Sequence, residues 1–270
     1  MDFHAEAVIA EDFMKFLMNG SLYQGSKPVM WSPVEKTALA EAEVEYHDHT
    51  SHQVWVRFKP RMVPQQNDID LRTHDDLRAA SVVIWTTTPW TIPQNRAVAF
   101  NPAIEYGLFE VQEVAENSTA RVGETLVLAN RLADGVMAAA KVTKFEKKRD
   151  VPASQLEQMG FEHPFRGVKD ADGNVVTEWD YNVPILPGDH VTDDAGTGFV
   201  HTAPSHGDDD YQLGLKFKLP MTYNVEPDGS YRADLPLFGG QHIITPDGKE
   251  GPANVSVIKQ LAYSGALLAK

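Results

Sequence analysis

Two short segments concentrate the side chains best suited to chemistry. The first, Trp85 to Pro93, reads WTTTPWTIP and holds four threonines, two tryptophans and two prolines. Threonine hydroxyls can hydrogen-bond a carbonyl, a ribose or a water, and proline stiffens the loop that presents them. The alternative is a threonine-rich strand followed by a proline turn, because threonine favours strands for its shape alone.

The second segment, Gly196 to Tyr211, reads GTGFVHTAPSHGDDDY. It passes from a glycine-rich turn through a short strand and a loop to the start of a helix, and His201 and Asp210 bracket the loop. Both side chains can therefore face one crevice. The alternative is structural: the aspartates cap a helix N-terminus, which attracts negative charge, and the histidine is a hydrogen-bonded core residue.

Helical and strand-like patterns alternate around these two segments. Apolar spacing and composition predict helices over 5–17, 35–43, 129–141, 208–217 and 255–268. Short β-branched or alternating runs predict strands over 54–58, 81–85, 106–111, 125–128, 142–145 and 199–202. The pattern favours a strand-rich α+β fold with helices at both ends.

Composition narrows the class of protein. The 270 residues are 42% hydrophobic and 23% charged, which is typical of a soluble globular chain with a sizeable core. The formal net charge of −14 argues against a strong free-standing nucleic-acid binder, but permits a module that receives RNA held by another domain. Since there is no cysteine, disulfides and thiolate zinc sites are excluded. No membrane span or signal peptide is evident, so we expect a cytoplasmic location and no membrane partner.

A group of three histidines, His47, His49 and His52, raises the question of a metal site. Their spacing and the lack of cysteine favour a solvated strand edge instead, so we predict no metal.

The two segments together resemble the threonine-rich and GTG…HTAPGHG…DDY motifs of isoleucyl-tRNA synthetase editing domains. The flanks match as well, so the resemblance covers almost the whole chain: Trp31-Ser32, Thr37 to Tyr46, Phe238-Gly239-Gly240 and Ser264 to Leu268. Valyl and leucyl editing domains carry TTRP-like and PAHD-like runs where this chain has TTTPWT and PSHG. Ser205 replaces the usual glycine and Asp208 a common proline, which leaves the path of that loop open.

The resemblance implies a β-barrel-like editing domain over 46–270 with peripheral and terminal helices, preceded by a helical lead-in segment or linker over 1–45. The implied reaction is hydrolysis of the ester that joins misattached valine to the isoleucine tRNA, with valyl-adenylate as a further substrate. The implied partners are the acceptor end of the misacylated tRNA and the rest of the parent synthetase. We expect a monomer and no cofactor. The HIGH-like and KMSKS-like motifs of the parent enzymes do not occur here, so we expect no ATP-dependent amino-acid activation.

Site roles follow from the same resemblance, residue by residue. Asp210 matches the carboxylate that holds the substrate's ammonium group, and His201 matches the residue that limits the pocket against isoleucine. Thr87 and Thr88 match the threonines around the ester and, with Asp210, form the expected catalytic set. The remaining expected substrate-binding residues are Thr86, Trp90 and Thr91.

Three alternatives stay open at this point. The chain is either a hydrolase or a noncatalytic module that docks the tRNA acceptor end, and a valyl-type editing domain that clears threonine is the nearer rival. The basic residues Lys144, Lys147, Lys148 and Arg149 either touch the acceptor end or form a solvated face, and we favour the second.

Overall fold

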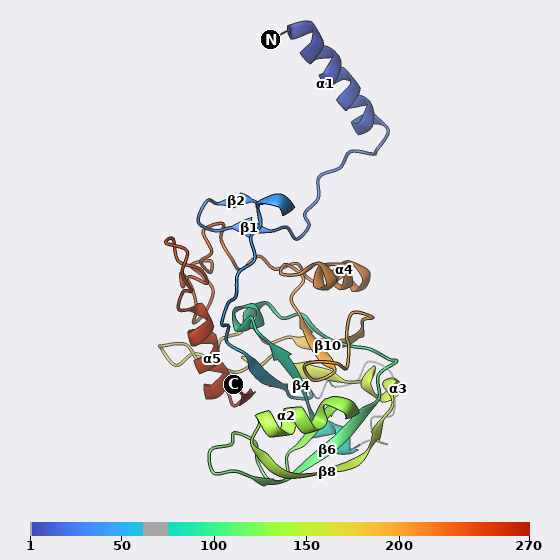
Figure 1. The fold of residues 1–270 in the computed structure, drawn as a ribbon, viewed down its shortest axis with the longest axis vertical. Coiled ribbons are helices and arrows are strands. Elements are labelled where there is room, and N and C mark those ends of the chain that lie inside the picture. The colour runs from blue at the N-terminus through green and yellow to red at the C-terminus, as the bar shows by residue number, and fades with distance from the viewer. Residues whose placement is uncertain (1, 62–74) are drawn as a thin grey trace.

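Two open sheets form the centre of the molecule in the computed structural model, which describes residues 2–61 and 75–270 (Figure 1). The larger sheet has six strands in the order β12-β3-β4-β7-β6-β8, and the smaller has four in the order β11-β5-β10-β9. The larger sheet contains β3 (Val54–Phe58), β4 (Ser81–Thr86), β6 (Tyr106–Val114), β7 (Thr125–Ala129), β8 (Val142–Val151) and β12 (Leu267–Ala269). The smaller contains β5 (Ala97–Phe100), β9 (Gly160–Glu162), β10 (Asn182–Pro187) and β11 (Phe199–Thr202).

Helices surround the sheets and occupy both ends of the chain. They are α1 (Phe3–Met18), α2 (Ala133–Ala139), α3 (Ala153–Leu156), α4 (Asp208–Phe217) and α5 (Ala253–Tyr263). Shorter 3₁₀ turns are η1 (Glu41–Glu43), η3 (Asp75–Arg78), η4 (Pro89–Gln94) and η5 (Asn130–Leu132), and β1 (Trp31–Ser32) pairs with β2 (Thr37–Ala38). The predicted strand-rich α+β class is confirmed. Over the described residues its sheets stay open instead of closing into a barrel.

Strand β4 is buried on both faces. Val82 and Ile84 belong to the largest apolar cluster, together with Phe100 of β5, while Val83 belongs to a second cluster that includes Met137 of α2. Successive side chains of a strand point to opposite faces, so a strand covered on both sides needs a continuous apolar run. The threonine-rich segment thus starts from the rigid end of a central strand.

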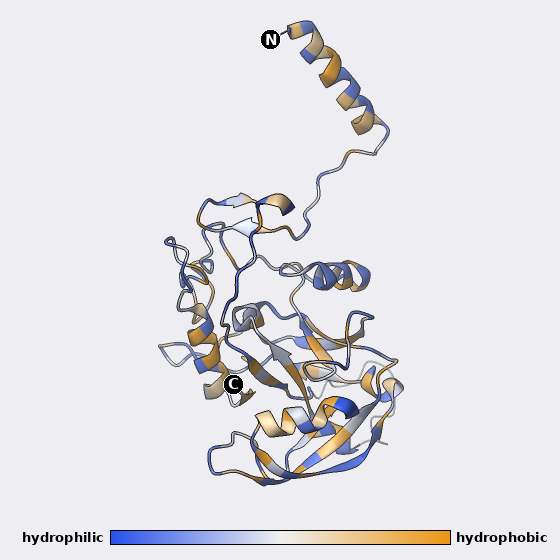
Figure 2. Ribbon diagram, viewed as in Figure 1, coloured by the Kyte–Doolittle hydropathy of each residue, from blue (hydrophilic) through white to orange (hydrophobic). Residues whose placement is uncertain are grey.

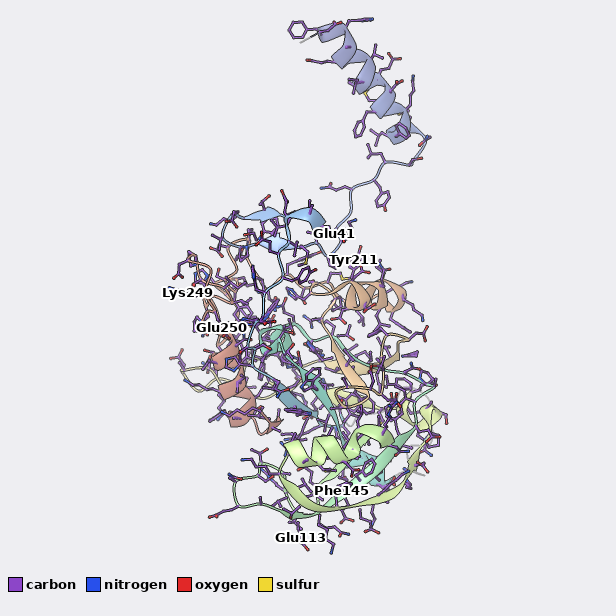
Figure 3. The ribbon with its side chains drawn as sticks, in the orientation of Figure 1. Glu41, Glu113, Phe145, Tyr211, Lys249 and Glu250 are labelled. Carbon is purple, nitrogen blue, oxygen red and sulfur yellow. The ribbon has the colours of Figure 1, made fainter. Side chains whose placement is uncertain are left out.

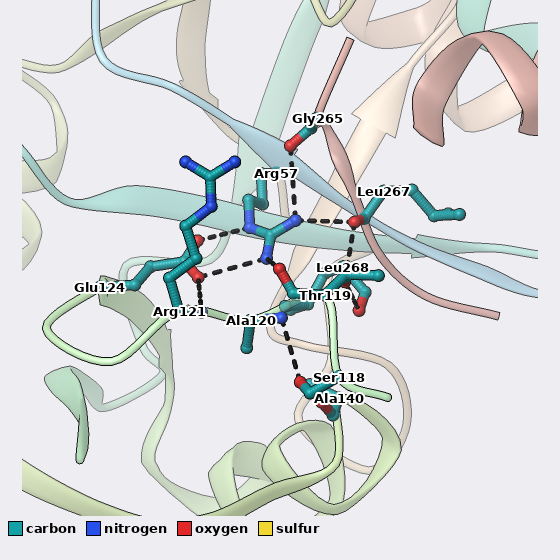
Figure 4. A network of polar contacts seen from close by, with 10 residues as sticks. All are labelled: Arg57, Ser118, Thr119, Ala120, Arg121, Glu124, Ala140, Gly265, Leu267 and Leu268. Atoms are coloured by element: carbon teal, nitrogen blue, oxygen red, sulfur yellow. Dashed lines mark hydrogen bonds and ion pairs between the residues drawn. The ribbon is translucent and has the colours of Figure 1, made fainter. Parts of the chain in front are cut away.

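The C-terminal strand is fastened to the larger sheet by a buried guanidinium (Figure 4). Arg57 of β3 is 5% exposed, forms an ion pair with Glu124, and donates to the carbonyls of Leu267 at 2.7 Å and Thr119 at 2.8 Å. Thr119 Oγ1 in turn donates to the Leu267 carbonyl at 3.0 Å. Arg57 and Thr119 therefore both supply donors to the Leu267 carbonyl, which connects the short strand β12 to β3 and to the loop before β7.

Helix α1 stands clear of the rest of the molecule and has no buried residue (Figure 1). Its apolar side chains, coloured orange among blue ones in Figure 2, include Ile9 and Phe13, which are 70% and 58% exposed. The β1–β2 hairpin that follows does touch the body, since Trp31 Nε1 donates to the Pro227 carbonyl at 2.8 Å. Among the described residues, no helix is long and apolar enough to cross a membrane.

Most predicted elements appear with shifted ends, and two predictions were wrong. The helix predicted over 35–43 is replaced by β2 and η1, because nine residues without a packing partner are too few to hold a helix on propensity alone. The helix predicted over 255–268 ends at Tyr263, where Ser264 and Gly265 turn the chain into β12. Gly265 adopts φ +72°, a conformation that helps to end helices.

Candidate active site

The threonine-rich segment turns sharply where β4 ends. Thr86 Oγ1 accepts a hydrogen bond from the Thr88 amide at 3.1 Å and lies 3.2 Å from Thr88 Oγ1. Pro89 then begins η4, a position that suits its fixed φ. Thr86 and Thr91 are 8% and 4% exposed, whereas Thr87 and Thr88 are exposed. The two threonines predicted to be catalytic are thus the two whose side chains reach solvent.

Side chains from distant parts of the chain hold the backbone of η4 in place. Tyr231 donates its hydroxyl to the Trp90 carbonyl at 2.5 Å, and Asn254 Oδ1 of α5 accepts from the Trp90 amide at 3.0 Å. The carbonyls of Ile92 and Pro93 face His163 Nε2 at 2.9 Å and Trp179 Nε1 at 3.0 Å. This fixed backbone determines where Trp90 and Thr91 point.

His201 of β11 lies against η4 and is 7% exposed. Its Nε2 is 2.7 Å from Thr91 Oγ1, and its Nδ1 is 3.3 Å from Asn95 Nδ2. Since Thr91 donates its own proton to the Thr88 carbonyl at 2.9 Å, the network assigns the imidazole proton to Nε2. Burial, reinforced by the nearby His206, lowers the pKa of His201 to about 4, so the ring is neutral near pH 7.

Asp210 stands in the first turn of α4, where the loop from β11 ends. Its Oδ2 accepts a hydrogen bond from the Ala203 amide at 3.0 Å. Burial raises the pKa of the Asp210 carboxyl to about 7, the Ala203 amide opposes that shift, and Asp209 adds to it. A carboxylate with so little compensation is prepared to bind a cation.

His206 joins the two segments and was not predicted as a site residue. Its Nε2 donates to Gln94 Oε1, and its ring meets the Trp90 ring edge-on, with centroids 4.9 Å apart and an 80° angle between planes. Burial lowers the pKa of His206 to about 4. The only signal in the sequence was its place in the GTG…HG motif, because nothing local indicates that it meets Gln94.

Four buried polar atoms in these segments lack a hydrogen-bond partner within the described chain: Gln94 Nε2, Asn95 Oδ1, Thr202 Oγ1 and Ser205 Oγ. Leaving such atoms unpaired costs about 1–3 kcal/mol each, so their grouping is more typical of a site than of a core.

The structure brings most of the predicted residues together. Thr86, Thr88, Thr91 and His201 form one hydrogen-bonded chain, and Trp90 joins it through η4. Within residues 2–61 and 75–270, no hydrogen bond links Asp210 to Thr87 or Thr88, and Asp210 is bound instead to the Ala203 amide in the loop after β11.

The histidine group and the basic group noted in the sequence both lie on the solvated surface. His47 and His52 face single carboxylates, Glu45 at 3.5 Å and Glu250 at 3.3 Å, and no group of three potential metal ligands occurs in the described part of the chain. The basic residues of β8 are paired with acids: Lys144 with Glu113, Lys147 with Asp150, Lys148 with Glu110 and Arg149 with Asp76. Glu113, the partner of Lys144, lies at the opposite end of the body from Tyr211 of α4 (Figure 3), so this end of the basic group is remote from α4.

The chain can now be compared with known proteins. Residues 1–226 match the model of the class I tRNA synthetases (I, L, M and V). The chain belongs to this family. It is 50% identical over its whole length to an isoleucine–tRNA ligase of Ruegeria pomeroyi and 47% identical to one of Bradyrhizobium diazoefficiens. The resemblance predicted from the motifs is thereby confirmed. The chain spans 27% and 26% of the length of these two relatives.

Solved structures with a similar course of the chain are editing domains of leucyl-tRNA synthetases. The GlLeuRS-CP1 crystal structure has a TM-score of 0.42 and 17% identity, covering 59% of this chain and 58% of that one. The P. knowlesi cytosolic leucyl-tRNA synthetase editing domain has a TM-score of 0.41 and 10% identity, covering 64% of each chain.

Proposed function

We propose that this chain is the editing domain of an isoleucyl-tRNA synthetase and hydrolyses the ester that joins valine to the isoleucine tRNA. Selection at synthesis cannot fully exclude valine. One methylene is worth only about 1–3 kcal/mol in a pocket, a limit for which isoleucine against valine is the standard illustration. A second site that admits valine, refuses isoleucine and hydrolyses what enters removes the error.

The observation that carries the proposal is the desolvated carboxyl of Asp210, bound to the Ala203 amide directly after the strand that carries the buried, neutral His201. Every aminoacyl ester presents a free α-ammonium group, and the Asp210 carboxylate provides its counter-charge. Binding of the ammonium lowers the pKa of Asp210 again, because an adjacent opposite charge favours the ionised form. An acceptor end that carries no amino acid has no ammonium group for this carboxylate to bind. The Asp210 carboxylate therefore favours a hydrolase of aminoacyl esters over a module that only docks the acceptor end.

His201 supplies selectivity instead of base catalysis. Both ring nitrogens are occupied by Thr91 and Asn95, so neither is available to take a proton from water. A ring held at both edges is a rigid wall, and Trp90 against His206 forms a second one. These walls set the size limit between the side chains of valine and isoleucine.

The exposed hydroxyls of Thr87 and Thr88 orient the ester and the attacking water. An aminoacyl ester is already activated, so holding a water in line with its carbonyl supplies much of the acceleration. Thr88 is itself oriented by Thr86 and, through its carbonyl, by Thr91. The chemistry assigned here needs no cofactor.

We further propose that the substrate reaches the site as the acceptor end of a tRNA bound by the rest of the parent synthetase in the cytoplasm. In this arrangement residues 46–270 are the editing domain and 1–45 the lead-in segment, and the exposed apolar side chains of α1 support that division. Valyl-adenylate is the second substrate to examine at the same site.

The test is single-turnover deacylation of isoleucine tRNA charged with valine, isoleucine or threonine. Rapid loss of valine alone is the expected result. Preferred loss of threonine would indicate a valyl-type domain, and binding of the charged tRNA without any deacylation would indicate a docking module.

A further inference from the structure

A pocket of about 330 Å³ lies beside the candidate active site and is not explained by it. Its walls include Gln53, Trp55 and Trp85 of neighbouring strands, Arg131 of η5, and Ala195 and Gly196. This volume falls in the range of small-ligand sites, about 300–1,000 Å³. None of Thr88, His201 and Asp210 lines it.

The two tryptophans provide the aromatic surface of the pocket. Trp55 and Trp85 are directly opposite each other on β3 and β4, and both rings are half-buried. The Trp85 ring is fixed by a hydrogen bond from its Nε1 to Gln53 Oε1 at 3.3 Å. Gly196, with φ +78°, crosses the other side, and a Cβ there would lie 3.5 Å from the Trp85 ring. These two contacts hold the Trp85 ring in one orientation.

A cation stands at the rim of this aromatic surface. Arg131 is 70% exposed and faces Asp193 at 3.6 Å, a loose pairing that leaves its planar guanidinium free to stack. Half-buried aromatic rings beside an arginine are the arrangement by which proteins bind unpaired nucleobases. A phosphate-binding groove would instead need several cations, and among the lining residues Arg131 is the one that carries a positive charge.

We infer that this pocket binds a nucleobase of the single-stranded acceptor end, stacked on Trp85 and Trp55 under Arg131. The inference rests on the proposed function, which brings that strand to the site. Trp85 immediately precedes Thr86, and Gly196 begins the segment that leads into β11 and His201. Trp85 of β4 lines the pocket, and Thr87 and Thr88 follow directly where that strand ends at Thr86, so a base bound in the pocket holds the strand near these hydroxyls while its terminal ester enters the site.

The experiment measures binding without chemistry. The probe is a fluorescent RNA hairpin with an uncharged CCA 3′ overhang, titrated with the full chain and followed by anisotropy. We expect Trp85→Ala to weaken binding about 5- to 100-fold, the range for loss of one base–aromatic stack, and Trp85→Phe to restore most of it. Arg131→Ala should weaken binding less, while Trp31→Ala, which lies outside the pocket, should leave it unchanged.

Two results would overturn the inference. One is equal affinity for the hairpin with and without its overhang. The other is wild-type affinity in Arg131→Ala and in a folded Trp85→Ala; since Arg131 is largely exposed, its variant tests the pocket even if Trp85→Ala does not fold. Overhang-dependent binding without deacylation of the valyl ester would refute the proposed hydrolase and leave the pocket standing.

Discussion

The Nε2 of His201 lies 2.7 Å from the Oγ1 of Thr91, a bond that joins β11 to the 3₁₀ turn after β4. The two residues are 110 positions apart in the chain. Because Thr91 also donates to the Thr88 carbonyl, the orientation of His201 and the path of the threonine-rich turn are coupled. In the proposed function, shape selection and ester positioning therefore depend on one small hydrogen-bonded network.

Removing the His201 ring should reduce the discrimination between valyl and isoleucyl esters. In His201→Ala we expect hydrolysis of isoleucyl-tRNA to rise about 10- to 100-fold while valyl-tRNA is still hydrolysed, because the lost ring volume admits the extra methylene. Single-turnover deacylation of both esters measures the ratio. His49→Ala, an exposed histidine elsewhere, serves as control. A His201→Ala protein that folds and still spares isoleucine would show that His201 is not the steric limit.

Removing the counter-charge should abolish binding of the ammonium. We expect Asp210→Asn to lower kcat/KM for valyl-tRNA about 100- to 5,000-fold, since losing one partner of a desolvated ion pair costs about 3–5 kcal/mol. Asp209→Asn is the matched control, because Asp209 is exposed and adjacent in sequence. Equal losses in the two variants would indicate a general effect of the acidic helix start instead of a specific contact.

The raised pKa of Asp210 predicts how activity depends on pH. The free protein must ionise this carboxyl before it binds an ammonium, so kcat/KM should rise with pH and level off above the Asp210 pKa of about 7. That rising limb should be missing in Asp210→Asn. A profile flat from pH 6 to 8 in the wild-type protein would contradict the assignment.

The same shift predicts how the free energy of unfolding depends on pH. A carboxyl whose folded-state pKa of about 7 lies above its ordinary 3.8 contributes stability that is present below pH 4 and lost as pH rises through 7. Asp210→Asn should therefore gain about 1–3 kcal/mol relative to wild type between pH 5 and 8. His201 and His206 act in the opposite direction below pH 6.5, since their pKa values are lowered, but they are common to both proteins. Urea unfolding at the two pH values measures the difference, with Asp209→Asn as control.

How far the site could be predicted from the sequence differs between its parts. Local patterns found β4 and β11, because a β-branched run and a glycine-bounded strand are visible without tertiary knowledge. The motifs then located the residues from Thr86 to Thr91, His201 and Asp210. The contact between His206 and Gln94 could not be predicted, since the two residues are 112 positions apart and only the packing of β5 between β11 and β10 brings them together.

Elements that depend on tertiary packing were also missed. Strand β5 follows directly on the threonine-rich segment as a four-residue run, Ala97–Phe100, too short to show a period of its own. All four residues are buried between β10 and β11 in the sheet. Since both of these strands come later in the chain, the sequence around β5 gives no sign of that burial. The reverse error occurred over 35–43, where good helix formers have no apolar surface to pack on.

The hydroxyl of Tyr231 lies outside the candidate site but should affect its selectivity, because it supports the backbone of η4. Tyr231 is 1% exposed and donates to the Trp90 carbonyl at 2.5 Å. In Tyr231→Phe we expect a loss of about 0.5–1.5 kcal/mol of stability and a reduced preference for valine over isoleucine, because η4 loses one of its supports. Tyr223→Phe, with its ring 66% exposed, should change neither quantity. Lower stability with an unchanged preference would limit Tyr231 to a structural role.

The buried ion pair of Arg57 and Glu124 should dominate the attachment of the C-terminal strand. Arg57→Met removes the cation from the Glu124 carboxylate and leaves the Thr119 carbonyl without the Arg57 donor, while the Leu267 carbonyl keeps Thr119 Oγ1 as its one side-chain donor, so we expect a loss of about 3–5 kcal/mol. Relative to wild type, amide exchange should increase most in β12, because Arg57 donates directly to this strand. Urea unfolding and hydrogen exchange measure the two effects, and Arg121→Met, an exposed neighbour of the network, is the control (Figure 4).

A double variant separates the charge from the backbone contacts. Replacing both partners of a buried ion pair by apolar residues often changes the free energy of unfolding little. Arg57→Met with Glu124→Leu should therefore recover the part of the lost stability that comes from leaving the Glu124 carboxylate without its cation. In the double variant the Thr119 carbonyl stays without the Arg57 donor and the Leu267 carbonyl keeps only Thr119 Oγ1, so β12 should still exchange faster than in wild type. Full recovery of both stability and β12 protection would show that Arg57 serves only to neutralise Glu124 and does not hold the C-terminal strand.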